Sequence, residues 1–219
     1  MPLMPASFPR CSLYLITPLL STADVSAFAK VFAAVLDAAP VASALVRLAP
    51  GAETDAKAIV APLLRAALAA DCALLIENDA RLAHRLGADG VHVAGASADL
   101  VAAIESLKPN RIVGAGSLRT RHDAMTASEL GADYVMFGEP RRGARAMGLE
   151  SLIERVSWWA EIFETPCVAY AEGISAVSEL ARAGADFVAL DEAIWSAVSP
   201  REAARQAEAL IAGVATQVP

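Results

Sequence analysis

The residues whose chemistry stands out in this chain follow two neighbouring apolar runs. Asn78 and Asp79 follow shortly after the run at 74–76, and His92 lies inside the run at 90–93. A carboxylate can hold Mg²⁺ together with waters and a ligand phosphate, and histidine can carry a proton near neutral pH. Asn78 and Asp79 are therefore candidates for a metal-and-substrate pair, with helix capping as the alternative. His92 is a candidate base, but a barrel-lining histidine that is hydrogen-bonded to its neighbours is the favoured interpretation.

The residues between these runs predict the elements that position this group. Apolar runs of three or four residues are too short for helices and suit buried strands. Leu82, Ala83 and Leu86 recur at helical spacing, and Gly87 stands where helices end. The pattern is strand, turn, helix, turn, strand. Because α/β barrels carry their chemistry at the carboxyl ends of parallel strands, we expect the polar residues at that end.

The tripeptide Gly-Ala-Asp occurs at 87–89, 131–133 and 184–186, each time before an apolar run. The glycines are 44 residues (131 − 87) and 53 residues (184 − 131) apart. One βα unit takes roughly 25–30 residues when eight units fill a barrel. Each spacing therefore covers two units, and the copies precede alternate strands. We interpret the tripeptide as a helix stop and turn at the floor of a barrel.

The whole chain alternates apolar runs with helical patterns and shows no linker. We expect strands at 12–17, 41–48, 74–76, 90–93, 111–115, 134–138, 167–170 and 187–190, each followed by a helix. Eight such units in 219 residues favour a (β/α)8 TIM barrel of the α/β class, with residues 1–219 as a single domain. An open doubly wound sheet is the alternative, but no glycine-rich nucleotide fingerprint follows the first strand.

The composition limits which binding partners and which cellular location we expect. Hydrophobic residues make up 56% of the chain and aromatic residues 5%, which suits aliphatic parallel strands covered by helices. A net charge of −7 disfavours nucleic acid, and no apolar run is long enough for a membrane span. Prolines stand where a signal peptide needs apolar residues, so we expect a cytoplasmic protein. Cys11, Cys72 and Cys167 lack metal spacing, which indicates buried structural thiols.

Further polar residues follow the other predicted strands. The candidates for ligand contacts are Arg47, Ser117, Glu139, Glu172, Gly173 and Asp191, with Glu192 beside the last. Arg141, Arg142 and Arg145 stand in the irregular stretch 139–148, where guanidinium groups could clamp a phosphate bidentately. Helix capping by Ser117 and the carboxylates, and a solvated loop for the arginines, are the alternatives. The carboxylates together predict an acidic rim.

The order of these motifs resembles the thiamine phosphate synthase and thiazole tautomerase family over most of the chain. The segment 76–93, in which an Asn-Asp pair is followed by Ala-Asp-Gly-Val-His, is especially similar, and 111–117, 131–138 and 165–190 match in place and character. The resemblance implies a (β/α)8 barrel, usually a homodimer, that acts on phosphorylated pyrimidine and thiazole precursors. It also implies Mg²⁺ at Asp79 and roles in the reaction for Asn78 and Ser117.

The sequence departs from the synthase pattern where a diphosphate would bind. Arg47 is the one cation of the segment 47–51, where the synthase has Gln-x-Arg-x-Lys. The stretch 139–148 has neither the threonines nor the lysine of the family's loop. Asp191 and Glu192 stand where small residues usually offer N–H groups to a phosphate. Carboxylates repel phosphate unless cations intervene.

The sequence therefore predicts a divergent thiamine phosphate synthase with weak or absent activity. The synthase joins hydroxymethylpyrimidine diphosphate to thiazole phosphate and releases pyrophosphate. Asp79 would hold Mg²⁺, and Arg47 with the loop arginines would hold the pyrophosphate. One alternative is a thiazole tautomerase-like enzyme, for which His92 and Glu139 are the candidate proton carriers. The other is a ligand-binding or regulatory barrel without catalysis. In each case the expected ligand is a small molecule.

Overall fold

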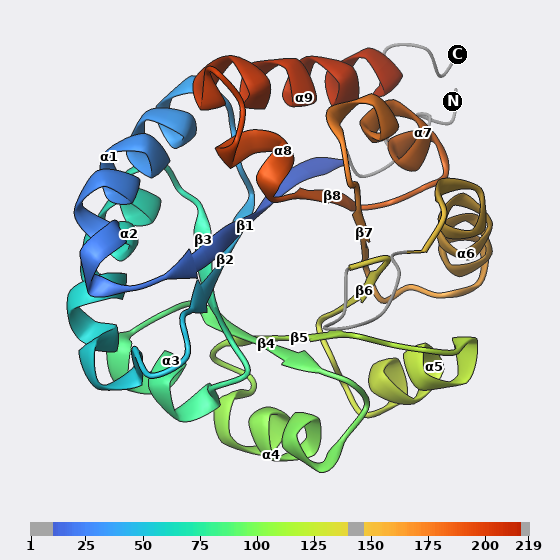
Figure 1. The fold of residues 1–219 in the computed structure, drawn as a ribbon. Coiled ribbons are helices and arrows are strands. Elements are labelled where there is room, and N and C mark those ends of the chain that lie inside the picture. Colours follow the sequence, from blue (N-terminus) through green and yellow to red (C-terminus); the bar gives the residue numbers. More distant parts are fainter. Residues whose placement is uncertain (1–10, 140–146, 216–219) are drawn as a thin grey trace, which may run out of the picture.

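A computed structural model describes residues 11–139 and 147–215 and shows a closed parallel barrel. Eight strands pair in sequence order, and β8 pairs with β1 to close the ring. The helices surround the strands (Figure 1). The predicted (β/α)8 TIM barrel is therefore confirmed. Within the described ranges, no helix combines the length and the apolar character that a membrane crossing requires.

The elements alternate regularly along the chain. The strands are β1 (Ser12–Leu20), β2 (Ser43–Leu48), β3 (Ala73–Glu77), β4 (Gly90–Ala94), β5 (Ile112–Gly116), β6 (Tyr134–Phe137), β7 (Cys167–Tyr170) and β8 (Phe187–Leu190). The α-helices are α1 (Thr22–Ala38), α2 (Ala56–Ala69), α3 (Ala80–Leu86), α4 (Ala98–Leu107), α5 (Arg121–Glu129), α6 (Leu149–Ile162), α7 (Val177–Arg182), α8 (Glu192–Trp195) and α9 (Pro200–Ala215). Short 3-10 turns at Glu53–Asp55 and Ile174–Ala176 precede α2 and α7.

Alternate side chains of each strand point into the barrel or toward the helices. The inward cluster consists of Tyr14, Ile16, Leu45, Leu75, Tyr134, Met136, Val168, Tyr170 and Ala189. The outward side chains, such as Leu13, Val46 and Val91, pack with the helices in a larger aliphatic cluster. Three tyrosines thus fill the barrel's interior, although aromatic residues are scarce in the chain.

The Gly-Ala-Asp turns lie at the amino-terminal end of the strands, as predicted, and their aspartates hold neighbouring strands together. Each carboxylate accepts a hydrogen bond from a backbone N–H of the preceding strand: Asp89 from Leu74 (2.7 Å), Asp133 from Val113 (2.8 Å) and Asp186 from Cys167 (2.8 Å). We call these contacts the aspartate clamps. They join β3 to β4, β5 to β6 and β7 to β8 at the end opposite the predicted site.

Strand β1 continues to Leu20, beyond the predicted end at Thr17. Its pairing with β2 shifts register between Ile16 and Leu19, because Pro18 has no N–H to donate to the ladder. The Thr17 hydroxyl accepts the backbone N–H of Arg47 at 3.0 Å. This side chain therefore replaces a missing carbonyl at the irregularity and fixes the position of Arg47.

Candidate active site

A cavity of about 70 Å³ lies at the carboxyl ends of the strands. Each of the eight strands, or the residues directly after it, contributes to the lining. The lining residues are Ile16, Leu45, Arg47, Glu77, Asn78, His92, Ala94, Ser117, Met136, Glu139, Tyr170 and Asp191. One water molecule occupies about 10–15 Å³ of cavity volume measured in this way. A cavity of this size therefore suits one small ring.

Asn78 lines the cavity and ties β3 to β4. It adopts a positive φ of 57°, a conformation that asparagine tolerates better than most residues. Its N–H donates to the carbonyl of His92 at 2.8 Å, and its side-chain oxygen accepts from the N–H of Ala94 at 2.8 Å. Asn78 therefore positions the strand that carries His92.

Glu139, Ser117 and His92 meet in the cavity, as the predicted site requires. Oε1 of Glu139 accepts a hydrogen bond from the backbone N–H of Ser117 and lies 3.9 Å from Nε2 of His92. Gly116 makes room for them, because a Cβ there would lie 2.2 Å from Oε1 and 2.3 Å from Nε2. The alternative role of Ser117 as a helix cap is wrong, since Thr120 caps α5.

A line of hydrogen bonds runs from His92 into the barrel. Nδ1 of His92 lies 2.8 Å from the hydroxyl of Tyr134, which lies 3.0 Å from the hydroxyl of Tyr14. Burial raises the pKa of both phenols above the ordinary range, so both stay protonated at neutral pH. Gly114 makes room for this line, because a Cβ there would lie 2.0 Å from the ring of Tyr134.

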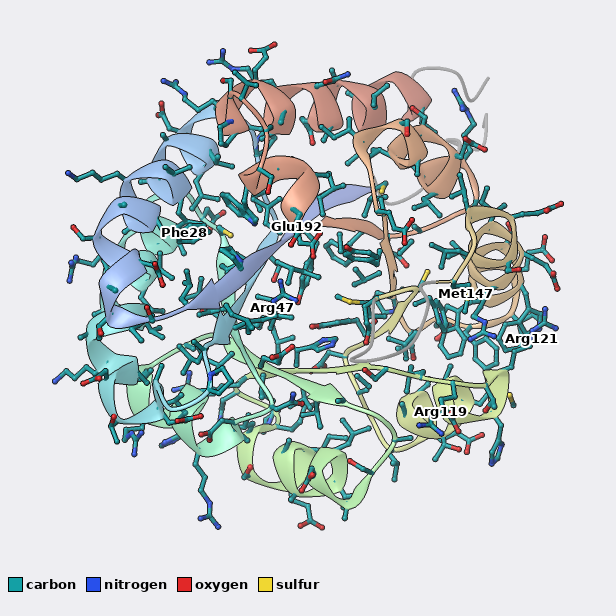
Figure 2. The ribbon with its side chains drawn as sticks, in the orientation of Figure 1. Phe28, Arg47, Arg119, Arg121, Met147 and Glu192 are labelled. Carbon is teal, nitrogen blue, oxygen red and sulfur yellow. The ribbon has the colours of Figure 1, made fainter. Side chains whose placement is uncertain are left out.

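Arg47 and Asp191 form the opposite side of the cavity. Nη2 of Arg47 lies 3.7 Å from Oδ2 of Asp191, and Figure 2 shows Arg47 turned toward the barrel's interior. The hydroxyl of Tyr170 donates to Oδ1 of Asp191 at 2.7 Å. Burial, followed by this hydrogen bond, raises the pKa of Tyr170 above its ordinary value. The buried carboxylate of Asp191 is thus satisfied from two sides, while Glu192 is exposed.

Other predicted site residues lie elsewhere. Asp79 does not line the cavity, because its carboxylate accepts from the N–H of Leu82 at 2.8 Å and caps α3. Glu172 is exposed, and Gly173 begins the 3-10 turn after β7; neither lines the cavity. The predicted phosphate clamps Arg141, Arg142 and Arg145 lie outside the described residues.

Glu77 and Tyr170 line the cavity but were not among the sequence candidates. Both are the last residues of their strands, whereas the candidates were sought after the strand ends. The alternation of side chains along a strand could have identified both residues. Leu75 points into the barrel, so Glu77, two residues later, points inward as well. Val168 and Tyr170 are related in the same way.

The cavity's described lining is acidic. Glu77, Glu139 and Asp191 oppose the single guanidinium of Arg47. Such a lining attracts cations and N–H donors and repels phosphate. No three His, Cys, Asp or Glu side chains within the described ranges gather closely enough to hold a metal ion. With Asp79 engaged at α3, the residues present do not fit a preformed Mg²⁺ site.

Fold and site together define a (β/α)8 barrel with a small polar pocket at the carboxyl ends of its strands, the face at which barrel enzymes act on small molecules. The family model for thiamine monophosphate synthase matches residues 13–194. The chain belongs to this family, as its sequence motifs predicted.

Curated relatives agree with this assignment, and a solved structure shares the fold. The thiamine-phosphate synthase of Rhodospirillum centenum is 37% identical over 196 residues, which cover 85% of this chain and 90% of that protein. The one of Hyphomonas neptunium is 37% identical over 194 residues, covering 86% and 87%. The structure of thiamine phosphate pyrophosphorylase from Pyrococcus furiosus has a TM-score of 0.79 at 22% identity, and the match covers 94% of this chain and 98% of that one. The structural likeness supports the fold.

Proposed function

We propose that this chain is a thiamine phosphate synthase-type transferase with strongly reduced turnover. The names of its relatives support the class of reaction, and the position of the cavity supports a small-molecule substrate. The reaction would join hydroxymethylpyrimidine diphosphate to thiazole phosphate and release pyrophosphate. A departing pyrophosphate accumulates negative charge, so positively charged groups around it stabilise the transition state.

One observation carries the reduced turnover. Arg47 is the only cation of the cavity's described lining, and its guanidinium already lies 3.7 Å from Asp191. Glu77 and Glu139 add negative charge nearby. Losing one well-placed electrostatic group costs ~10²–10³ in rate, and losses within one site are not additive. We therefore expect turnover lower by about this factor than in a relative with the full set of cations.

Magnesium enters this proposal only as a weakly bound ion. Asp79 is the carboxylate that the family resemblance assigns to the metal, but here it caps α3. A single carboxylate leaves most of the coordination of Mg²⁺ to water, so we expect weak binding to the free protein. Calorimetry that gave sub-micromolar affinity without any diphosphate would contradict this. We assign no step of the reaction to the ion.

The test is turnover of the two substrates with Mg²⁺, measured beside the Rhodospirillum centenum relative. Turnover below ~1 s⁻¹, the low end for typical enzymes, is expected, and a higher value would contradict the proposal. A variant with Arg141, Arg142 and Arg145 all changed to Ala decides whether these arginines replace the family's lysine. If they do, the residual turnover disappears in this variant.

The homodimer and the cytoplasmic location are further parts of the proposal. Analytical sedimentation tests the homodimer, and cell fractionation tests the location.

A second candidate is a proton-transferring barrel like thiazole tautomerase. The proximity of His92 and Glu139, at 3.9 Å, favours it, because a carboxylate beside an imidazole can move a proton. Isomerisation of a thiazole phosphate by the wild type, lost in Glu139→Gln, would support this candidate over the synthase. Binding of precursors without either reaction would instead indicate a ligand-binding barrel.

A further inference from the structure

We propose that a groove between α2 and α3, on the outside of the barrel, binds a small amphipathic anion, a molecule with an apolar body and one negatively charged group. We call this groove the outer cavity. Its lining residues are Glu53, Thr54, Lys57, Ala61, Leu64, Arg85 and Leu86. None of them lines the cavity at the strand ends, so the inference concerns a second ligand and does not depend on the proposed function.

The outer cavity lies between two helices of unequal length. α2 and α3 are neighbours in the ring of helices (Figure 1), but α2 has 14 residues and α3 has 7. Since each helical residue adds about 1.5 Å, α3 is half as long as α2 and cannot cover its whole length. The outer cavity has a volume of about 720 Å³, within the range of about 300–1,000 Å³ for ligand pockets. It is therefore large enough for a ligand with several carbon atoms beyond its charged group.

Apolar side chains contribute to the lining from both helices. Ala61 and Leu64 follow Lys57 on α2 at spacings of four and seven residues, so these three side chains lie on one face of the helix. Leu86 lines the outer cavity from α3. The three apolar side chains are only half-buried, and a ligand's apolar body would remove their exposed part from water. The lining thus favours a ligand whose body is apolar.

Two cations complete the lining. Lys57 and Arg85 are exposed, and neither forms an ion pair with another residue in the described part of the chain. Glu53 is the one carboxylate of the described lining, and its Oε1 accepts from the backbone N–H of Gly51 at 3.4 Å. Two unpaired cations and one carboxylate leave the outer cavity positively charged, so it attracts an anion.

The position of Lys57 also favours an anionic ligand. Lys57 is the second residue of α2, and the partial positive charge at the amino end of a helix repels a cation. Asp55 precedes α2 but makes no capping hydrogen bond with its side chain, and neither α2 nor α3 contains Asp or Glu. An anion beside Lys57 would be stabilised by the ammonium group and by the helix end together.

The test uses octanoate, an anion with an apolar chain, as the probe on the full chain, with affinities measured by NMR titration. 1-Octanol lacks the charge of octanoate, and acetate lacks its chain. We expect the wild type to bind octanoate at least about fivefold more tightly than either of them, a modest factor because both cations are exposed. Equal affinities for octanoate and 1-octanol, or for octanoate and acetate, would overturn the proposal.

Two double variants with the same change in charge test the role of the cations. Lys57→Gln with Arg85→Gln should reduce the preference for octanoate over 1-octanol to less than about twofold. Arg65→Gln with Arg81→Gln removes the same charge from the same two helices, at exposed residues outside the lining, and should keep the preference. Equal losses in both double variants would reveal a general effect of charge and would overturn the proposal.

The wild type alone shows where the probe binds. Methyl resonances of Leu64 and Leu86 should shift when octanoate is added, more than those of Leu45 and Met136, which line the cavity at the strand ends. The absence of shifts at Leu64 and Leu86 would refute the site. Sedimentation showing that the first double variant dissociates a dimer, with octanoate binding unchanged, would instead assign this surface to a second copy of the chain. These experiments read binding without turnover, so a failed synthase assay leaves their outcome unaffected.

Discussion

Thr17 holds Arg47 at two points. The backbone N–H of Arg47 donates to the Thr17 hydroxyl at 3.0 Å, and its guanidinium Nε donates to the Thr17 carbonyl at 2.7 Å. Thr17 is fully buried at the register shift between β1 and β2. The irregularity in β1 therefore orients the cavity's one described cation toward Asp191.

We predict that Thr17→Val lowers the free energy of unfolding by ~1 kcal/mol, because the partly buried N–H of Arg47 loses its acceptor. Urea denaturation measures this change. Thr17→Ser keeps the hydroxyl and should cost clearly less. If Val and Ser cost the same, the hydroxyl has no role in holding Arg47.

Gly116→Ala should disrupt the site without removing any functional group from it. The new Cβ would lie 2.2 Å from Glu139 and 2.3 Å from His92, so both side chains must move. We expect a loss of ~1–3 kcal/mol from overpacking together with loss of ligand binding, measured by urea denaturation and NMR titration. Unchanged binding would show that the two side chains need not lie at this position.

Gly213→Ala provides the matched control for that substitution. Gly213 lies inside α9 and is exposed, and a Cβ there would meet nothing within 4 Å. Alanine favours helix over glycine by ~0.5–1 kcal/mol. We therefore expect a small gain in stability and no change in ligand binding.

The cap of α5 should make part of the stability sensitive to acid. Hydrogen bonds from the backbone of Thr120, and then of Arg119, lower the pKa of Asp123 below its ordinary value of 3.8. A carboxylate with a lowered pKa in the folded state contributes stability above that ordinary value and loses it as the pH falls further. Asp123→Ala should thus be less stable than the wild type at neutral pH, by less than about 1 kcal/mol because the group is exposed. Urea denaturation should show that the difference in stability between Asp123→Ala and the wild type disappears as the pH falls below 3.8. A difference that stays constant with pH would show that the charge of Asp123 does not contribute to the cap.

The three cysteines should be unreactive in the native protein. Burial raises the pKa of Cys11, Cys72 and Cys167 to about 12, so almost no thiolate forms at neutral pH. We expect slow modification by a thiol reagent until denaturant is added, when all three react. Cys72 and Cys167 are buried as predicted, whereas Cys11 is only partly buried because it stands just before β1. Rapid modification of Cys72 or Cys167 in the native state would count against their role as buried structural thiols.

Much of the fold could be predicted because the strand and helix periods are clear in the sequence. β7 and β8 have the predicted bounds, since both are short apolar runs with polar residues on each side and a glycine-containing turn on one side. β1 was harder, because Pro18 looks like a strand end in the sequence. Only the bulge against β2 lets the strand continue past it.

The site could be predicted in part. His92, Asn78, Arg47, Ser117, Glu139 and Asp191 do line one cavity. Asp79 does not, because its carboxylate caps α3. Which of two adjacent polar residues faces the cavity depends on the local backbone path, which hydropathy does not report.

The aspartate clamps give the floor of the barrel a period of two strands. The backbone carbonyls of Asp89 and Asp186 also accept the N–H groups of Ile112 and Ser12, at 2.9 Å each, so these two turns join the strands on both sides of them. These contacts all lie at the end of the barrel opposite the cavity. The clamps therefore hold the ring closed from its floor, and substitutions at the opposite rim leave every one of these contacts in place.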